Sequence, residues 1–175
     1  MRKTLFILVL IALISCEKEK KDEAIPELFK LPLTDWSLTK KQVKEKETRT
    51  LVNDTDPSEI VYLAYPWEDK GDGGLKYTDD DFLDEVNYGF YNTNKTLEVV
   101  ICIYTRTNIR TTDVALEFLN KKYGEYTTTK LKPDFTGFEG YKYQFNAPFG
   151  VVVLEEYSSK TNRILFTKSK YASSL

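Results

Sequence analysis

The pattern of apolar and polar positions divides the chain into an apolar leader, a charged segment and a long region of alternating elements. Leu5 to Ile14 is an unbroken apolar run, whereas residues 17–23 (EKEKKDE) contain no apolar residue. A segment without apolar residues cannot bury surface and stays solvated. We therefore expect a leader over residues 1–15, a flexible tether over residues 16–30 and a single folded domain over residues 31–175.

Two stretches of the domain have the signals of a helix. Thr39-Lys40-Lys41-Gln42 matches a capping box, and Leu38 and Val43 occupy the positions of a hydrophobic staple. They predict a helix from Lys40 to about Arg49, with Trp36 before it as a core anchor. A second helix is predicted to begin near Thr112 or Asp113 and to stop at Gly124. Its apolar residues recur at helical spacing: Val114, Ala115, Phe118, Leu119 and Tyr123.

Six stretches have the alternation or the apolar content of strands. They are residues 60–65, 86–91, 97–105, 140–145, 151–157 and 163–168. The stretch 97–105 is apolar on both faces, which predicts a central strand that is covered on both sides. Residues 53–57 have turn chemistry, and the glycine-rich residues 66–77 predict a loop.

The predicted order is helix, three strands, helix, three strands. This order indicates an α+β fold in which two α-β-β-β units form an antiparallel sheet, with two helices packed on one face. The two units share this order but little residue identity.

The leader has the layout of a secretory signal peptide, with Arg2 and Lys3 before the apolar run and small Ser15 after it. The run is too short to cross a bilayer, which takes about 20 apolar residues. Its end, Leu13-Ile14-Ser15-Cys16, resembles the bacterial lipobox. That resemblance implies cleavage before Cys16 and attachment of lipid to Cys16, and therefore a protein anchored to the outer membrane.

The acidic positions after the cysteine loosely resemble a surface-export signal of Bacteroidota-type lipoproteins, although lysines interrupt them. The domain is therefore expected to face either the periplasm or the cell surface. The layout with Trp36 and Val43 in one unit, and Phe118-Leu119 and Tyr123-Gly124 in the other, resembles small Bacteroidota lipoproteins. It more remotely resembles the two-unit β-lactamase inhibitory protein and the small outer-membrane assembly lipoproteins.

Composition narrows the classes of function. The chain has 25 basic and 27 acidic residues and no histidine. Histidine-dependent nucleophilic sites and histidine-containing zinc sites are therefore excluded. The mild acidity gives no basic footprint for nucleic acid, and no cofactor is expected. With Cys16 lipidated, Cys102 is a lone thiol, either a buried core residue or a nucleophile that would need a nearby base.

The acidic and aromatic residues near the glycine-rich stretch are the candidate site. Asp69, Asp72, Asp79 and Asp81 are weak candidates for calcium ligands, although Lys70 at the third position breaks an EF-hand pattern. The alternative is a solvated loop followed by a helical turn capped by Asp79 or Asp80. Tyr65, Trp67 and Tyr77 are candidates for an exposed ligand or partner surface, or else pack the loop against the sheet.

These observations favour a lipid-anchored, non-catalytic domain that binds a protein or another envelope component and meets the membrane through the lipid on Cys16. An alternative is a carbohydrate- or calcium-binding surface lipoprotein that uses loop 65–85. A lesser alternative is a carboxylate-only hydrolase, which for glycosides would need two acidic side chains about 5–10 Å apart across a pocket.

Overall fold

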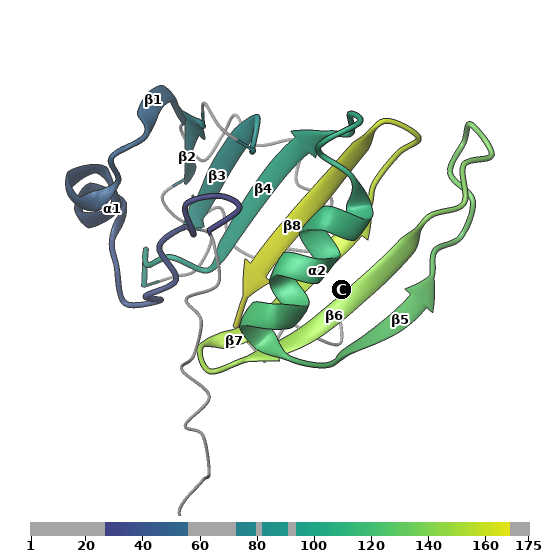
Figure 1. Cartoon of the computed structure of the whole chain (residues 1–175). Coiled ribbons are helices and arrows are strands. Elements are labelled where there is room, and N and C mark those ends of the chain that lie inside the picture. The colour runs from purple at the N-terminus through teal and green to yellow at the C-terminus, as the bar shows by residue number, and fades with distance from the viewer. Residues whose placement is uncertain (1–26, 56–72, 80–81, 91–93, 169–175) are drawn as a thin grey trace, which may run out of the picture.

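The computed structural model describes residues 27–55, 73–79, 82–90 and 94–168, and these form an eight-stranded antiparallel sheet with two helices. The strand order is β1-β2-β3-β4-β8-β7-β6-β5, so the two units meet at the antiparallel β4–β8 pair (Figure 1). The elements are α1 (Lys40–Lys46), β1 (Thr50–Thr55), β2 (Gly73–Thr78), β3 (Glu85–Phe90), β4 (Val99–Thr105), α2 (Thr112–Tyr123), β5 (Tyr126–Lys130), β6 (Tyr141–Ala147), β7 (Gly150–Glu156) and β8 (Thr161–Thr167).

The α+β class and the antiparallel sheet are confirmed, but each unit has four strands instead of three. β1 covers part of the stretch that was predicted as a turn, β2 covers part of the predicted loop, and β5 was not predicted. β1 and β5 are edge strands with largely exposed side chains, so they lack the apolar alternation that marks a strand. β2 begins with Gly73-Gly74, which are typical of loops. The predicted strand 60–65 lies outside the described residues.

The two helices cover the sheet unequally. α2 lies across the second unit and buries Thr112, Ala115, Phe118 and Leu119, whereas α1 lies at the β1 side of the sheet and buries only Val43 (Figure 1). Both helices begin at the predicted caps, Thr39 with its capping box and Thr111 bonded to the backbone N–H of Val114. α1 ends at Lys46, before the predicted Arg49, because Glu47 already has extended backbone angles.

The extended segment 27–38 supplies the packing that the short α1 cannot. Phe29 and Leu38 are 2% and 3% exposed and belong to the same core cluster as Val43, Phe118 and Leu119. The Trp36 indole N–H donates a 2.6 Å hydrogen bond to the carbonyl of Phe149, which ties this segment to the second unit. The folded domain therefore begins before residue 31, within the stretch predicted as a tether.

The central pair of strands is buried on both faces, as predicted for residues 97–105. Val100 and Cys102 belong to the core cluster that contains the buried residues of both helices, and Val99 and Ile101 are 1% and 2% exposed on the opposite face. The midpoint pairing of Cys102 with Ile164 lies at the centre of the eight-stranded sheet. The loops at the ends of this sheet form the candidate site.

Candidate functional site

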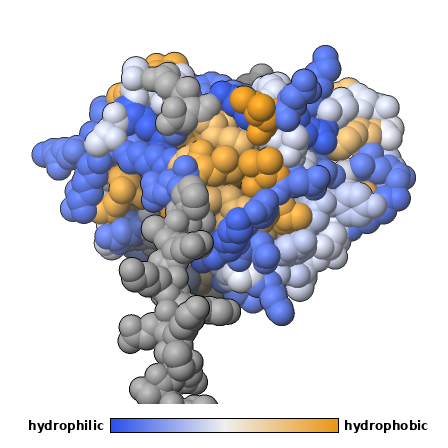
Figure 2. All heavy atoms as spheres, viewed as in Figure 1, coloured by the Kyte–Doolittle hydropathy of each residue, from blue (hydrophilic) through white to orange (hydrophobic). Residues whose placement is uncertain are grey.

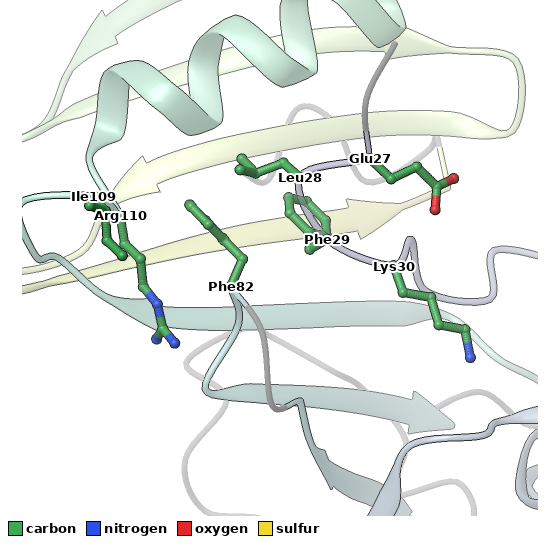
Figure 3. A pocket seen from close by; sticks show the side chains of 7 residues that line it. All are labelled: Glu27, Leu28, Phe29, Lys30, Phe82, Ile109 and Arg110. Atoms are coloured by element: carbon green, nitrogen blue, oxygen red, sulfur yellow. The ribbon is translucent and has the colours of Figure 1, made fainter. Parts of the chain in front are cut away.

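An open groove lies beside the start of α2, between the N-terminal segment and two loops at the end of the sheet. Its volume is about 580 Å3, and its lining residues are Glu27, Leu28, Phe29, Lys30, Phe82, Ile109 and Arg110. Phe29 and Phe82 lie side by side in the middle, with Ile109 and Arg110 at one end and Glu27 and Lys30 at the other (Figure 3). Apolar surface gathers alongside α2 on this face of the molecule (Figure 2).

Stacked aromatic rings form the floor of the groove. The rings of Phe29 and Phe82 are 5.8 Å apart at an angle of 25°, and Phe29 also contacts Phe118 of α2 at 5.0 Å. Phe82 in turn packs 4.8 Å from Tyr104 of β4. Because each ring packs against a different element, the floor is continuous with the core.

The wall at Ile109 and Arg110 is held by polar contacts. The Arg110 guanidinium is 2.6 Å from the carboxylate of Asp84, which also accepts a 2.6 Å hydrogen bond from the backbone N–H of Thr105. The Thr107 hydroxyl accepts bonds from the backbone N–H groups of Ile109 and Arg110. In this turn Ile109 is 79% exposed to solvent. The groove therefore combines an apolar floor and an exposed aliphatic side chain with charges at its rim.

At the opposite end, Lys30 connects the groove to a buried ionic cluster of the first unit, which consists of Glu47, Arg49, Asp79 and Tyr88. Glu47 Oε2 is 2.9 Å from Arg49 Nη1, and Arg49 Nε is 2.6 Å from Asp79 Oδ2. The Tyr88 hydroxyl donates to Glu47 and accepts a bond from the backbone N–H of Leu33. The side chains of Glu47, Arg49 and Asp79 are only 1%, 5% and 7% exposed.

The cluster keeps its charges although it is buried. Burial alone would raise the pKa of Glu47, but the bonds from Tyr88 and the Arg49 backbone, together with the Arg49 charge, lower it below its ordinary value. Burial opposes the charge of Arg49 as well, yet the bond to Asp79 and the charge of Glu47 raise the Arg49 pKa. These hydrogen bonds and ion pairs favour the charged forms of Glu47 and Arg49, so the cluster has a structural role.

Two residues of the predicted site lie in or beside this cluster. Tyr77 is 2% exposed, so the candidate role in an exposed binding surface is corrected, and the alternative, in which Tyr77 is packed, holds for this residue. Burial, followed by the charges of Glu47 and Asp54, raises the pKa of Tyr77 to about 12. Asp79 is ion-paired with Arg49 and is not an open calcium ligand. Tyr65, Trp67, Asp69, Asp72 and Asp81 lie outside the described residues.

Cys102 has the environment of a core thiol. Its side chain is fully buried in β4, and burial raises the pKa of the thiol above its ordinary value. A reactive thiol needs the opposite, a lowered pKa and access to solvent. The prediction that Cys102 packs the core is therefore confirmed.

Within the described part of the chain, no group of three or more His, Cys, Asp or Glu residues is placed to hold a metal ion. The carboxylates of Glu47 and Asp79 both bind the Arg49 guanidinium, and neither lines the groove. Among the described lining residues Glu27 is the single acid, so the facing pair of carboxylates that a glycoside hydrolase needs is not found there.

Few local patterns in the sequence point to the residues of the groove. Phe82 follows three consecutive aspartates, and Ile109 stands alone between polar residues, so neither belongs to an apolar pattern. Phe29 lies in the short apolar run after the charged segment, and this run was the one available signal. The groove forms because residues 27–30, 82 and 109–110 converge in space.

No protein-family model matches the chain, and no curated protein or solved structure shows significant similarity to it. In the ranges that the structure describes, neither helix is long and apolar enough to cross a membrane.

Proposed function

We propose that this chain is a lipid-anchored protein of the cell envelope, held to the outer membrane through Cys16, that binds a protein partner without catalysing a reaction. The layout of residues 1–16 supports the anchor, since a positive head and an apolar run precede Ser15-Cys16. The charged residues that follow Cys16 lead into Glu27 and Leu28, which already line the groove. The proposed binding site therefore lies close to the attachment point along the chain.

The observation that carries the binding proposal is the exposure of Ile109 beside an aromatic floor. A large aliphatic side chain that is 79% exposed leaves most of its apolar surface in water, and a partner that covers it recovers that free energy. Apolar centres with charged rims are typical of protein-binding hot spots. The rim carries charges of both signs, from Glu27, Lys30 and Arg110, and Lys30 and Arg110 are paired with Glu47 and Asp84 within the chain.

The anchor is tested by labelling the full-length chain in a bacterial host with a radioactive fatty acid. The wild-type chain should incorporate label and sediment with membranes, and Cys16→Ser should lose both properties because the acceptor thiol is absent. Cys102→Ser is the matched control and should remain labelled and membrane-bound. Equal labelling of wild type and Cys16→Ser would overturn the proposed attachment.

The groove is tested by site-specific photo-crosslinking on intact envelopes. A crosslinking amino acid at position 109 should capture a discrete protein partner, whereas the same amino acid at the exposed Val52 of β1 should not. Phe82→Ala, combined with the crosslinker at position 109, should reduce the yield because it removes part of the floor. Equal patterns at positions 109 and 52 would count against a binding role for the groove.

A further inference from the structure

The last strand at one side of the sheet, β5, has an open edge. It pairs only with β6, and no strand of the described residues lies beyond it (Figure 1). All five of its residues, Tyr126 to Lys130, are exposed. Neither a helix nor a described loop therefore covers the polar backbone groups along this edge.

The register shows which backbone groups point outward. The N–H of Leu131 donates a 2.9 Å bond to the carbonyl of Gly140, in the same register as the pairs of β5 with β6. In an antiparallel ladder the bonded pairs alternate, so Thr127 and Thr129 are bonded to β6. The N–H and C=O groups of Tyr126, Thr128 and Lys130 therefore point away from the sheet and can bond another strand.

The opposite edge of the sheet, β1, has features that hinder such pairing. Its register shifts between Leu51 and Asn53, which marks a bulge or irregularity, and Asp54 is ion-paired with Lys40 and Lys44 of α1. Bulges and charges are the usual means by which proteins protect an edge strand. β5 has no register shift and no proline, and a single charge at its end.

From this contrast we propose that β5 pairs antiparallel with β5 of a second copy of the chain, centred on Thr128, and joins the two sheets into one. The sequence Tyr-Thr-Thr-Thr-Lys is self-complementary in this arrangement. Thr128 faces Thr128 of the other copy in a bonded pair, and Tyr126 faces Lys130 on both sides of the centre. All outward N–H and C=O groups of the three residues then find partners.

The side chains across this junction are compatible with one another. Tyr126, Thr128 and Lys130 lie on the face of the sheet that carries α2, because Tyr126 pairs with Phe145 of the core. Lys130 is ion-paired with Glu139 of its own chain, and in this arrangement its side chain also lies opposite the Tyr126 ring of the other copy, where a cation–π contact is favourable. Thr127 and Thr129 meet across the other face, and such cross-strand threonine pairs stabilise sheets.

A tyrosine cluster beside the edge extends the same surface. Tyr126 packs against Tyr143 at 5.7 Å and Phe145 at 5.2 Å, and Tyr141 lies 6.4 Å from Tyr143. Tyr126 and Tyr141 remain 37% and 42% exposed. Pairing along β5 would bring the clusters of two copies together and shield part of this aromatic area. Two-dimensional confinement by a lipid anchor would raise the effective concentration for pairing.

The arrangement predicts a specific disulfide. In a bonded antiparallel pair the Cα atoms are about 5.5 Å apart, a separation that a disulfide can bridge. Thr128→Cys in the full chain, oxidised mildly in membranes, should therefore yield a disulfide-linked dimer. Val52→Cys on exposed β1 is the matched control and retains both native cysteines. A dimer yield from Thr128→Cys no greater than from Val52→Cys would overturn the proposal.

A second pair of variants tests the backbone bonds. Thr128→Pro removes an outward N–H in each copy without removing a bond to β6, whereas Thr128→Ala keeps that N–H. Sedimentation of the full chain in detergent should show dimers for wild type and Thr128→Ala, with dimerisation weakened roughly tenfold or more in Thr128→Pro. Melting curves verify that all three chains are folded. The proposal is overturned if the wild-type chain is monomeric or if the alanine and proline variants dimerise equally. It is also overturned if Thr128→Cys forms disulfides only with a different protein.

Discussion

The two units of the sheet differ in the residues that pack over their strands. In the second unit, the 12-residue α2 places Ala115, Phe118 and Leu119 on the sheet and ends at Gly124. In the first unit, the seven-residue α1 contributes one buried residue, Val43, and ends at Lys46, with Glu47 as its C-cap. The space that a longer helix would fill is taken by segment 27–38 and by the ionic cluster around Glu47.

The residue that caps the C-terminal end of each helix differs between the two units. Gly124 ends α2 with a φ of 83°, a conformation that glycine adopts without steric cost. Glu47 at the corresponding end of α1 has ordinary extended angles, and its side chain accepts bonds from the backbone N–H groups of Thr48 and Arg49. The first unit therefore depends on charge pairing where the second depends on backbone conformation and apolar packing.

The largest expected effect comes from breaking the ionic cluster. Glu47→Ala leaves Arg49 beside Asp79 alone and leaves the buried Tyr88 hydroxyl without its acceptor. Removal of one member of a buried charge network typically costs about 3–5 kcal/mol, and we expect about 4 kcal/mol here. Urea unfolding of the full chain in detergent measures the change. A loss below about 1 kcal/mol would show that the cluster is not the support of the first unit.

The next largest effect is expected at Phe29, which tests whether segment 27–38 substitutes for helix packing. Phe29→Ala removes ring contacts with Phe82 and Phe118 and should lower the free energy of unfolding by about 3 kcal/mol. Ile109→Ala is the control in the same groove, and its loss should stay within about 0.5 kcal/mol because the side chain is exposed. Similar losses in both variants would contradict the assignment of Phe29 to the core.

A pH titration separates the contribution of the Glu47 charge to stability from the contribution of its side-chain packing. The folded pKa of Glu47 lies below the ordinary value of 4.5, so the ionised form stabilises the fold at higher pH. This contribution is fully present above pH 4.5 and is lost as the pH falls through the folded pKa. The stability difference between wild type and Glu47→Gln should therefore shrink in acid. A difference that stays constant between pH 7 and the acid range would contradict an ionised Glu47.

The smallest effect tests the other helix end. Gly124→Ala introduces a side chain at positive φ and should cost about 1 kcal/mol, although no heavy atom lies within 4 Å of the added Cβ. The cost is conformational and should not vary with pH, unlike that of Glu47. Thermal unfolding at two pH values measures both properties. A loss of stability in Gly124→Ala that depends on pH would contradict the conclusion that this end of α2 relies on backbone conformation and not on charge.

Local signals in the sequence identified the elements that have strong local determinants. The capping box at Thr39, the stop at Gly124 and the apolar strand around Cys102 all lie where the structure has them. The exposed edge strands were missed because their side chains face water, and alternation requires a buried face. The sequence left two alternatives for Tyr77, an exposed surface or packing against the sheet, because its direct sequence neighbours are polar, and its neighbours in space, Tyr88 and the core, decide for packing.

The sequence by itself determined the charged segment after Cys16, the α+β class and the apolar centre of the sheet, because composition, caps and periodicity act over a few residues. Only the tertiary structure decided the groove, the buried ions and the open edge of β5. Glu47 meets Asp79 through Arg49, and Phe29 meets Phe82, across long stretches of chain. Such meetings depend on strand order and register, which no local pattern specifies.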